Sequence, residues 1–253
     1  RSGRALERVA NVFFVLAGAD TGDAIEAVER DVSPLLARHA NALYLNRALY
    51  ARIADLYGRR DKLGLSPEQA RVLDRYHTRF VRAGAALDQA QQDRLAAINE
   101  RLASLGTQFG QNVLADEKSY AMILEESDLA GLPDFARDAA GAAAAERGHP
   151  GKYAITLARS SAETFLQFSS RRDLREKLFN AFIKRGENGG ATDNRATIAE
   201  TVKLRAERAA LLGFKTFADY RLDDQMAKTP AAARKLLEDV WTRARARALA
   251  DRD

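Results

Sequence analysis

The chain has 253 residues, of which 46% are hydrophobic and 30% are charged, a globular composition that excludes collagen-like, low-complexity and wholly disordered proteins. It contains no cysteine, which excludes disulfides, thiolate metal sites and cysteine nucleophiles. Its net charge is +5, from 40 basic and 35 acidic residues. The positive residues are spread along the chain without interleaved aromatic residues, so we interpret them as solvated helical faces rather than as a nucleic-acid-binding surface.

The first helix signals lie before residue 85. Ser33-Pro34 predicts a helix start, and Ser66-Pro67-Glu68-Gln69 predicts a capping box with proline at the first helical position. The helix after this box has a stripe with helical spacing, made of Leu73, Tyr76, Phe80 and Gly84. Asp20-Thr21-Gly22 has the letters of the aspartic-protease triplet, but we interpret it as a turn between helices, because three letters recur by chance.

A long helix is predicted from Asp88 to about Asp116. Asp88 stands three residues before Gln91, a variant of the capping-box spacing. One apolar seam follows the helix with a spacing of three or four residues, through Leu95, Ile98, Leu102, Leu105, Phe109 and Val113. The link Gly84–Leu87 before it is either a kink or a turn, and a turn would make the two helices an antiparallel hairpin.

The pattern changes near Ser119, where two short strands are predicted at about Tyr120–Leu124 and Tyr153–Leu157. Each is too short to be stable alone, so we expect the two to pair as a small antiparallel element. Between them the sequence predicts a turn at Gly131-Leu132-Pro133, an alanine-rich helix and a break at Gly148–Gly151.

Helices are predicted again after the strands, at about 161–168, 171–184, 194–212, 216–223 and from Pro230 onward. Ser160 with Glu163 marks the first of these starts, and Thr229-Pro230 marks the last. The loosest loop is expected at Gly186–Gly190.

The helix after Asn194 is interpreted as architectural rather than substrate-binding. Its expected packing stripe consists of Ile198, Val202, Ala209 and Leu212. Gly213 is expected to end this helix, and Phe214 and Phe217 to anchor the next turn.

Together these signals predict a mainly α protein, a multi-helix lobe with helical hairpins and one small two-stranded antiparallel element. Residues 1–116 are expected to form a helical segment with the long hairpin, and residues 117–253 the strand pair followed by helices of the same lobe. Arg1 is not a start methionine, and the last helical pattern reaches Asp253 without a C-cap, so we expect the chain to be truncated at both ends.

Candidate catalytic and metal-ligating residues are few. His39 and His77 lie at the edges of apolar helical faces, and His149 lies in a Gly/Pro turn. The helical zinc motif H-E-x-x-H, which needs two histidines four residues apart on one helix face, does not occur in the sequence. Phosphate-binding glycine loops and the G-x-S-x-G serine motif do not occur in it either.

Two pairs of adjacent acids, Glu125-Glu126 and Asp223-Asp224, also fail to make a proton-sharing pair. Neighbouring residues on a helix point about 100° apart, and on a strand they face opposite sides. We interpret both pairs as solvated caps. From the residues alone we predict no catalytic or metal-binding residue in this chain, and its substrate-binding residues are unknown.

A resemblance rests on two long stretches. The first contains Phe13–Thr21, Asp31-Val32-Ser33-Pro34 and Leu43–Ile53. The second, which is more specific, contains the segments Asp173–Phe179, Asn194-Arg195, Ile198, Lys203–Phe214, Ala218–Tyr220 and Asp224–Pro230. With these segments in order along almost its whole length, the chain resembles the thimet-oligopeptidase family of zinc metallopeptidases, closest to its bacterial peptidyl-dipeptidase branch.

The resemblance implies a helical, two-lobed enzyme around a deep channel, in which one zinc ion activates water and the glutamate of H-E-x-x-H is the general base. Members cleave oligopeptides, and the dipeptidase branch removes dipeptides from the C-terminal end. The family's zinc ligands lie in a later portion that this chain lacks, so none maps onto a position here. The chain would be the N-terminal lobe and part of the channel wall, without zinc and inactive alone.

The implied partners are short peptides and the missing C-terminal catalytic lobe, with neither nucleic acid nor a membrane among them. An apolar surface with Leu236, Leu237, Val240 and Trp241 is expected to be exposed and able to drive dimerisation. The alternatives are a stand-alone helical module that binds peptides or proteins without catalysis, and a nucleic-acid-binding helical domain. Cytoplasm and periplasm are both compatible with the sequence.

Overall fold

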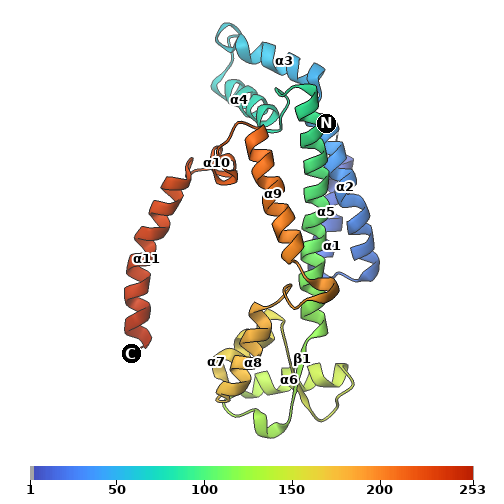
Figure 1. The fold of residues 1–253 in the computed structure, drawn as a ribbon, viewed down its shortest axis with the longest axis vertical. Helices are drawn as coiled ribbons and strands as arrows, with labels where there is room; N and C mark the ends of the chain where they lie inside the picture. Colours follow the sequence, from blue (N-terminus) through green and yellow to red (C-terminus); the bar gives the residue numbers. More distant parts are fainter. Residues whose placement is uncertain (1–2, 253) are drawn as a thin grey trace. The chain divides into compact units, whose positions relative to one another are not determined.

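The computed structural model describes residues 3–252 (Figure 1), and 75% of the chain is helical. Its contacts divide it into two compact units. The first unit consists of Arg1–Ser104 with Glu200–Asp253, and the second of Leu105–Ala199. The mainly α class is confirmed. The organisation into residues 1–116 and 117–253 stays a prediction.

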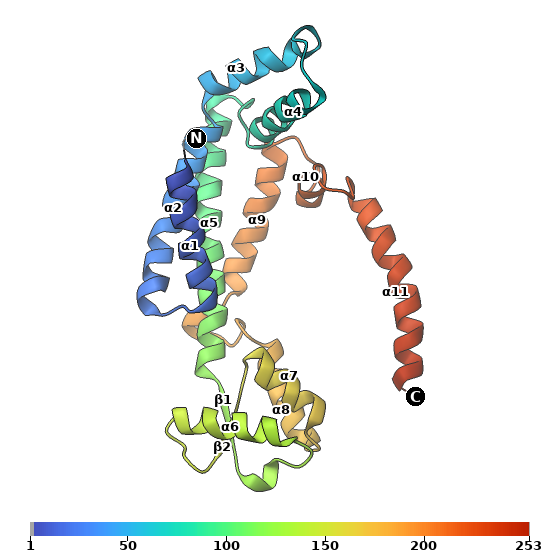
Figure 2. The same cartoon turned by 180° about the vertical axis from the view of Figure 1, so that it is seen from behind.

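Before the strands the helices are α1 (Arg4–Ala19), α2 (Asp23–Tyr44), α3 (Arg47–Gly58), α4 (Pro67–Arg82) and α5 (Gln89–Ser119). The last three helices of the chain are α9 (Arg195–Leu211), α10 (Phe217–Leu222) and α11 (Pro230–Arg252). Figures 1 and 2, seen from opposite sides, both show α1, α2 and α9 alongside α5. In the described residues no helix is both long and apolar enough to cross a membrane.

The start and the seam of α5 follow the prediction closely. The Gln91 backbone N–H donates to Asp88 Oδ1 at 2.8 Å, and the Asp88 N–H donates to the Gln91 side chain at 3.3 Å. Three seam residues have 1% exposure or less: Leu95, Ile98 and Leu105. Phe109 departs from the seam, because 42% of it is exposed.

A pair of amides joins α2 to α5. Asn41, which is buried, donates from its side chain to the Ala96 carbonyl at 3.2 Å and accepts from the Asn99 side chain at 2.8 Å. Buried amides are stable only with such partners, so this contact fixes where the two helices meet.

The helix start predicted at Ser33-Pro34 is wrong, because both residues lie inside α2. The Ser33 hydroxyl donates to the Glu29 carbonyl one turn earlier, at 2.8 Å, instead of capping a new helix. Proline costs the helix one backbone donor, and the turn at Asp20-Thr21-Gly22, which is confirmed, supplies the real start of α2.

The capping box of α4 is confirmed, with Gln69 N–H donating to Ser66 Oγ at 3.2 Å and Ser66 N–H to Gln69 Oε1 at 2.9 Å. The link to α5 is a turn in which Gly84 has φ +97°. A Cβ on Gly84 would lie 2.3 Å from Leu95 Cδ2, so only glycine fits there. Helices α4 and α5 meet near this turn, whereas α4 packs chiefly along α3.

The apolar packing stripe predicted for the helix after Asn194, which is α9, is partly wrong. Ala209 is buried, but Ile198 and Val202 are 47% and 60% exposed. The side of α9 that meets α5 carries carboxylates instead: Arg94 donates to Glu207 at 2.6 and 2.8 Å, and Arg101 to Glu200 at 2.6 and 2.7 Å. The hydrogen bonds from Arg101 lower the pKa of the Glu200 carboxyl. Leu204, on the same side of α9, is buried together with Ala209, whereas Ile198 and Val202 lie at the surface.

The second unit is built on the predicted strand pair. Strands β1 (Ala121–Leu124) and β2 (Tyr153–Thr156) are antiparallel, with Ala121 opposite Thr156 and Leu124 opposite Tyr153. Helices α6 (Asp134–Glu146) and α7 (Arg159–Phe168) pack against β2, and α8 (Arg172–Ile183) packs against α7. The core of this unit is apolar and includes Leu129, Phe165 and Leu178, each at most 1% exposed.

The cap predicted from Ser160 and Glu163 does not form, because α7 begins earlier, at Arg159. Glu163 accepts from Arg159 at 2.7 Å instead of capping the helix. The next serine, Ser161, accepts from the Thr156 N–H at 3.1 Å and ties the end of β2 to the first turn of α7. The predicted start at Thr229-Pro230 is confirmed, since Thr229 Oγ1 accepts from the Ala232 N–H at 3.2 Å.

Candidate functional site

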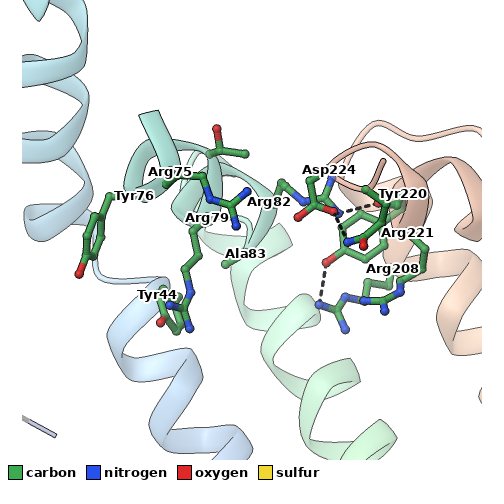
Figure 3. Close-up of a pocket in the computed structure, with 12 residues that line it drawn as sticks. Tyr44, Arg75, Tyr76, Arg79, Arg82, Ala83, Arg208, Tyr220, Arg221 and Asp224 are labelled. Carbon is green, nitrogen blue, oxygen red and sulfur yellow. Dashed lines mark hydrogen bonds and ion pairs between the residues drawn. The ribbon is translucent and has the colours of Figure 1, made fainter. Parts of the chain in front are cut away.

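A cavity of about 510 Å³ lies within the first unit, where the end of α2 meets α4, α9 and α10. Five of its lining residues are arginines: Arg75, Arg79, Arg82, Arg208 and Arg221. Tyr44 and Tyr220 line it as well, and Asp224 is the acidic residue in its lining. Figure 3 shows these side chains around the hollow. We refer to this cavity as the arginine pocket.

Helix geometry explains why α4 supplies three of the five arginines. Arg75, Arg79 and Arg82 are separated by four and three residues, a spacing that puts side chains on one face of a helix. Arg208 comes from the last turn of α9 and Arg221 from α10. The last turn of α9 and the end of α10 therefore line the pocket together with α4.

Arg82 is an anchor rather than a free ligand-binding group. It donates to Asp223 at 2.7 Å and to the Tyr220 carbonyl at 2.6 Å, and it lies 3.3 Å from Asp224. Its side chain is only 12% exposed, so this pairing offsets the cost of desolvating its charge. Asp223-Asp224 was predicted to be a solvated cap. Asp223 is indeed the C-cap residue of α10 and is half exposed, and both carboxylates in addition pair with Arg82 and tie α4 to the end of α10.

The turn after α9 holds the wall in place. Gly213 has φ +80° and ends α9, and Phe214 N–H donates back to the Ala209 carbonyl at 2.9 Å. The Phe214 and Phe217 rings lie 5.4 and 5.9 Å from the Tyr220 ring. The predicted anchoring role of the two phenylalanines is confirmed.

The remaining arginines carry charge that the described residues do not neutralise. The Arg79 guanidinium lies 4.6 Å from the centre of the Tyr44 ring, and Arg208 donates to the Tyr220 hydroxyl at 3.0 Å. In the described residues, none of Arg75, Arg79, Arg208 and Arg221 has a carboxylate within ion-pair distance. The buried Nε of Arg208 has no hydrogen-bond partner there either. The pocket therefore has several N–H donors and an excess of positive charge.

The histidines do not converge on this pocket or on one another. His39 is exposed on α2, and His149 is exposed in the turn after α6. His77 stacks on Tyr57, with ring centres 3.8 Å apart, and burial lowers its pKa. Across residues 3–252 no three His, Cys, Asp or Glu side chains form a group that could hold a metal ion. These residues do not fit a catalytic zinc ion, and we assign no step through zinc to them.

A second polar centre, in the second unit, was missed from the sequence. Asp116 is buried and accepts from the Gly186 N–H at 2.7 Å, from Asn188 at 3.0 Å and from the Thr192 hydroxyl. The Thr192 hydrogen bond is the largest cause that lowers the pKa of Asp116. The loop at Gly186–Gly190, predicted to be the loosest, is therefore tied to α5. All of these partners belong to the short segment from Gly186 to Thr192, so we assign Asp116 a structural role.

The arginine pocket was missed as well, although one signal for it was present. The spacing of Arg75, Arg79 and Arg82 predicts a basic face on α4. The sequence does not reveal that Arg208 and Arg221 join this face, because they lie more than 120 residues later.

The family model and the individual proteins that match this chain all describe peptidases. Residues 165–252 match the model for peptidase family M3. The chain is 39% identical over 249 residues to the dipeptidyl carboxypeptidase of Escherichia coli K12, an alignment that covers 98% of this chain and 37% of that protein. The dipeptidyl carboxypeptidase of Salmonella typhimurium is 38% identical with the same coverage.

A more distant relative is oligopeptidase A of Salmonella typhimurium, which is 32% identical over 87% of this chain and 33% of its own length. The chain thus spans little more than a third of the curated relatives it matches. The resemblance drawn from the sequence is confirmed, and the chain is related to the peptidases of family M3.

Proposed function

We propose that this chain is the N-terminal lobe of a zinc-dependent peptidyl-dipeptidase or oligopeptidase that hydrolyses short peptides. The observation that carries the proposal is the 39% identity to a dipeptidyl carboxypeptidase over 98% of the chain. In this role the chain forms part of the wall of the peptide channel and supplies no catalytic group.

The physical character of the first unit suits a channel wall. A wall that selects substrates by size must hold its shape. The capped start of α5, the Arg–Glu pairs between α5 and α9 and the anchored Arg82 all restrict movement of these helices. The arginine pocket adds a polar surface on which part of a peptide can be held.

Zinc chemistry belongs, in this proposal, to the part of the protein outside the chain. Peptidases of family M3 depend on zinc in general, and a protein-bound zinc ion supplies an activated water molecule. The described histidines and carboxylates do not fit such a site. We therefore expect the 253-residue chain alone to bind no stoichiometric zinc and to have no peptidase activity.

The test compares the full-length protein with the 253-residue chain on the same quenched fluorescent peptide. We expect the full-length protein to release C-terminal dipeptides, to lose activity with a chelator and to regain it with zinc. The chain alone should show background rates with or without added zinc. Chelator-sensitive turnover by the chain alone would contradict the proposal, and so would a full-length protein without peptidase activity.

Helix α11 supports a second part of the proposal, namely contact with the catalytic lobe. Its large apolar side chains are mostly exposed: Leu236 66%, Leu237 70%, Val240 58% and Trp241 65%. Exposed apolar clusters commonly mark interfaces. We propose that this face contacts the catalytic lobe in the whole protein, and that it makes the isolated chain dimerise.

Light scattering at increasing concentration tests the dimer. The unaltered chain should approach twice its monomer mass, and a Leu237→Ser/Trp241→Ser variant should stay monomeric. A matched Ile198→Ser/Val202→Ser variant, altered at two exposed positions of α9, should dimerise normally. A clean monomer for the unaltered chain at high concentration would count against this part of the proposal.

One observation also favours the alternative, a stand-alone peptide- or protein-binding module. The arginine pocket is lined entirely by residues of the first unit. It needs no residue from the catalytic part to form. If the gene ends at Asp253, binding without catalysis becomes the better assignment, and the reading frame downstream of that codon decides between the two.

A further inference from the structure

The arginine pocket has the properties of a binding site for negatively charged groups. Its one acidic lining residue, Asp224, is already engaged with Arg82. The other four arginines retain their charge in the described residues. We propose that the pocket binds the carboxylates of an acidic peptide. That the carboxylates belong to a peptide rests on the proposed function, whereas the affinity for an anion does not.

The donors that face the pocket are held before any ligand arrives. The Tyr44 ring supports the Arg79 guanidinium at 4.6 Å, and the Tyr220 hydroxyl accepts from Arg208 at 3.0 Å. A guanidinium group held in this way can present two parallel N–H donors to one carboxylate. Less freedom is lost on binding, because the side chains are already in place.

Arg208 differs from Arg75, Arg79 and Arg221 in its burial. It is half-buried, and its Nε has no hydrogen-bond partner in the described residues. A buried donor without an acceptor is unfavourable in a folded protein. Because this Nε is closed to solvent, a carboxylate in the pocket would bind the terminal N–H groups of Arg208, which share the positive charge of the guanidinium.

The volume of the pocket permits more than one carboxylate. Small-molecule sites in proteins range from about 300 to 1,000 Å³, and this cavity measures about 510 Å³. Arg75 and Arg79 line it from α4, and Arg208 and Arg221 line it from α9 and α10. Two neighbouring acidic side chains of one peptide could therefore each reach an arginine.

The aromatic residues argue against a single-stranded nucleic acid. Binding of that kind uses open ring faces on which bases stack. The Tyr44 ring is covered by Arg79, and the Tyr220 ring by Arg82 at 4.7 Å and Arg208 at 5.2 Å. Tyr76 stands apart from the arginines in Figure 3. The rings that lie among the guanidinium groups are therefore unavailable to bases.

The test measures binding to the 253-residue chain by fluorescence anisotropy. The probes are a fluorescein-labelled peptide with three consecutive glutamates and the same peptide with glutamines in their place. We expect the glutamate peptide to bind at least tenfold more tightly, with an affinity that falls as salt is raised. Equal affinity for the two peptides would overturn the proposal.

Substitutions place the binding in the pocket. We expect Arg79→Gln to weaken binding of the glutamate peptide about two- to fivefold, because this side chain is exposed. Arg208→Gln should weaken it about tenfold, because its contact is partly desolvated. Arg52→Gln, at an exposed position of α3 outside the pocket, is the matched control and should bind like the unaltered chain.

The outcomes separate this inference from the proposed function. Unchanged binding of the glutamate peptide to both Arg79→Gln and Arg208→Gln would overturn the pocket assignment. If Arg208→Gln fails to fold, the binding measured with Arg79→Gln decides the question alone. A single-stranded oligonucleotide that binds more tightly than the glutamate peptide, and loses affinity in Arg79→Gln, would overturn the choice of ligand. No hydrolysis is measured, so an inactive full-length protein would refute the proposed function and leave this result unaffected.

Discussion

Between α5 and α9 the first unit is joined by charge, whereas the centre of the second unit is apolar. Arg94 and Arg101 contact Glu207 and Glu200 through exposed or half-exposed side chains. In the second unit the residues at the centre, such as Phe165, are almost fully buried. Burial of apolar surface contributes far more to stability than exposed ion pairs do. We therefore expect these two regions, the α5–α9 ion pairs and the core of the second unit, to respond very differently to single substitutions.

The largest effect is expected in the apolar core. Phe165→Ala should lower the free energy of unfolding by about 3–5 kcal/mol, because it removes a ring that is 1% exposed and leaves a cavity. Urea unfolding followed by circular dichroism measures this loss. Phe179→Ala is the matched control on α8, where half of the ring is exposed, and it should cost about 1 kcal/mol or less. Equal losses in the two variants would contradict the contrast.

An intermediate effect is expected at Arg82. Arg82→Met should destabilise the first unit by about 2–3 kcal/mol, because Asp223 and Asp224 lose their partner. Thermal unfolding of the variant and of Arg52→Met gives the comparison. Adding Asp224→Asn to Arg82→Met should cost less than the separate losses together, since one contact links the two residues. Strict additivity would show that the two side chains act independently.

The second polar centre gives a prediction about pH. Its hydrogen bonds lower the pKa of Asp116 in the folded state. The stabilisation is therefore fully present above the unfolded pKa of about 3.9 and is lost as the pH falls through the lower folded pKa. Asp116→Asn should lower stability by about 1–2 kcal/mol at pH 7. The gap between the variant and the unaltered chain should shrink below about pH 4, and a gap that widens in acid would contradict this assignment.

The smallest effect is expected between α5 and α9. Arg101→Gln should cost less than any change above, because both partners of this pair are substantially exposed. The loss should shrink further at high salt, which screens exposed charges. Unfolding in low and high salt measures it. A loss as large as that of Phe165→Ala would contradict the weak contribution expected of this exposed pair.

This contrast also explains which parts of the fold could be predicted from the sequence. The strands at Ala121–Leu124 and Tyr153–Thr156 lie within one residue of their predicted bounds, because short apolar runs between turns have a clear pattern. The caps at Ser66 and Asp88 were predictable because their partners lie three residues away. Local signals of this kind need no knowledge of the tertiary structure.

The errors arose where distant partners decide the outcome. Ile198 and Val202 were placed in a packing stripe, but the side of α9 that is buried carries Leu204 and Ala209 instead, beside the Glu–Arg pairs with α5. Pro34 was taken for a helix start, although the surrounding helix tolerates one lost donor. The arginine pocket depends on Arg208 meeting α4 across the chain, and periodicity within one helix does not predict such a meeting.

The amide contact between α2 and α5 has a consequence for their alignment. Sliding one helix past the other by a turn, about 5.4 Å, would separate Asn41 from both the Ala96 carbonyl and the Asn99 side chain. Polar groups would then be buried without partners, and the shifted arrangement would be less stable. A purely apolar seam would not impose this cost on a shift. A single buried asparagine can select one register among several of similar apolar burial. In this chain Asn41 thus specifies the register of α2 against α5, and it contributes more to the uniqueness of that pairing than to its strength.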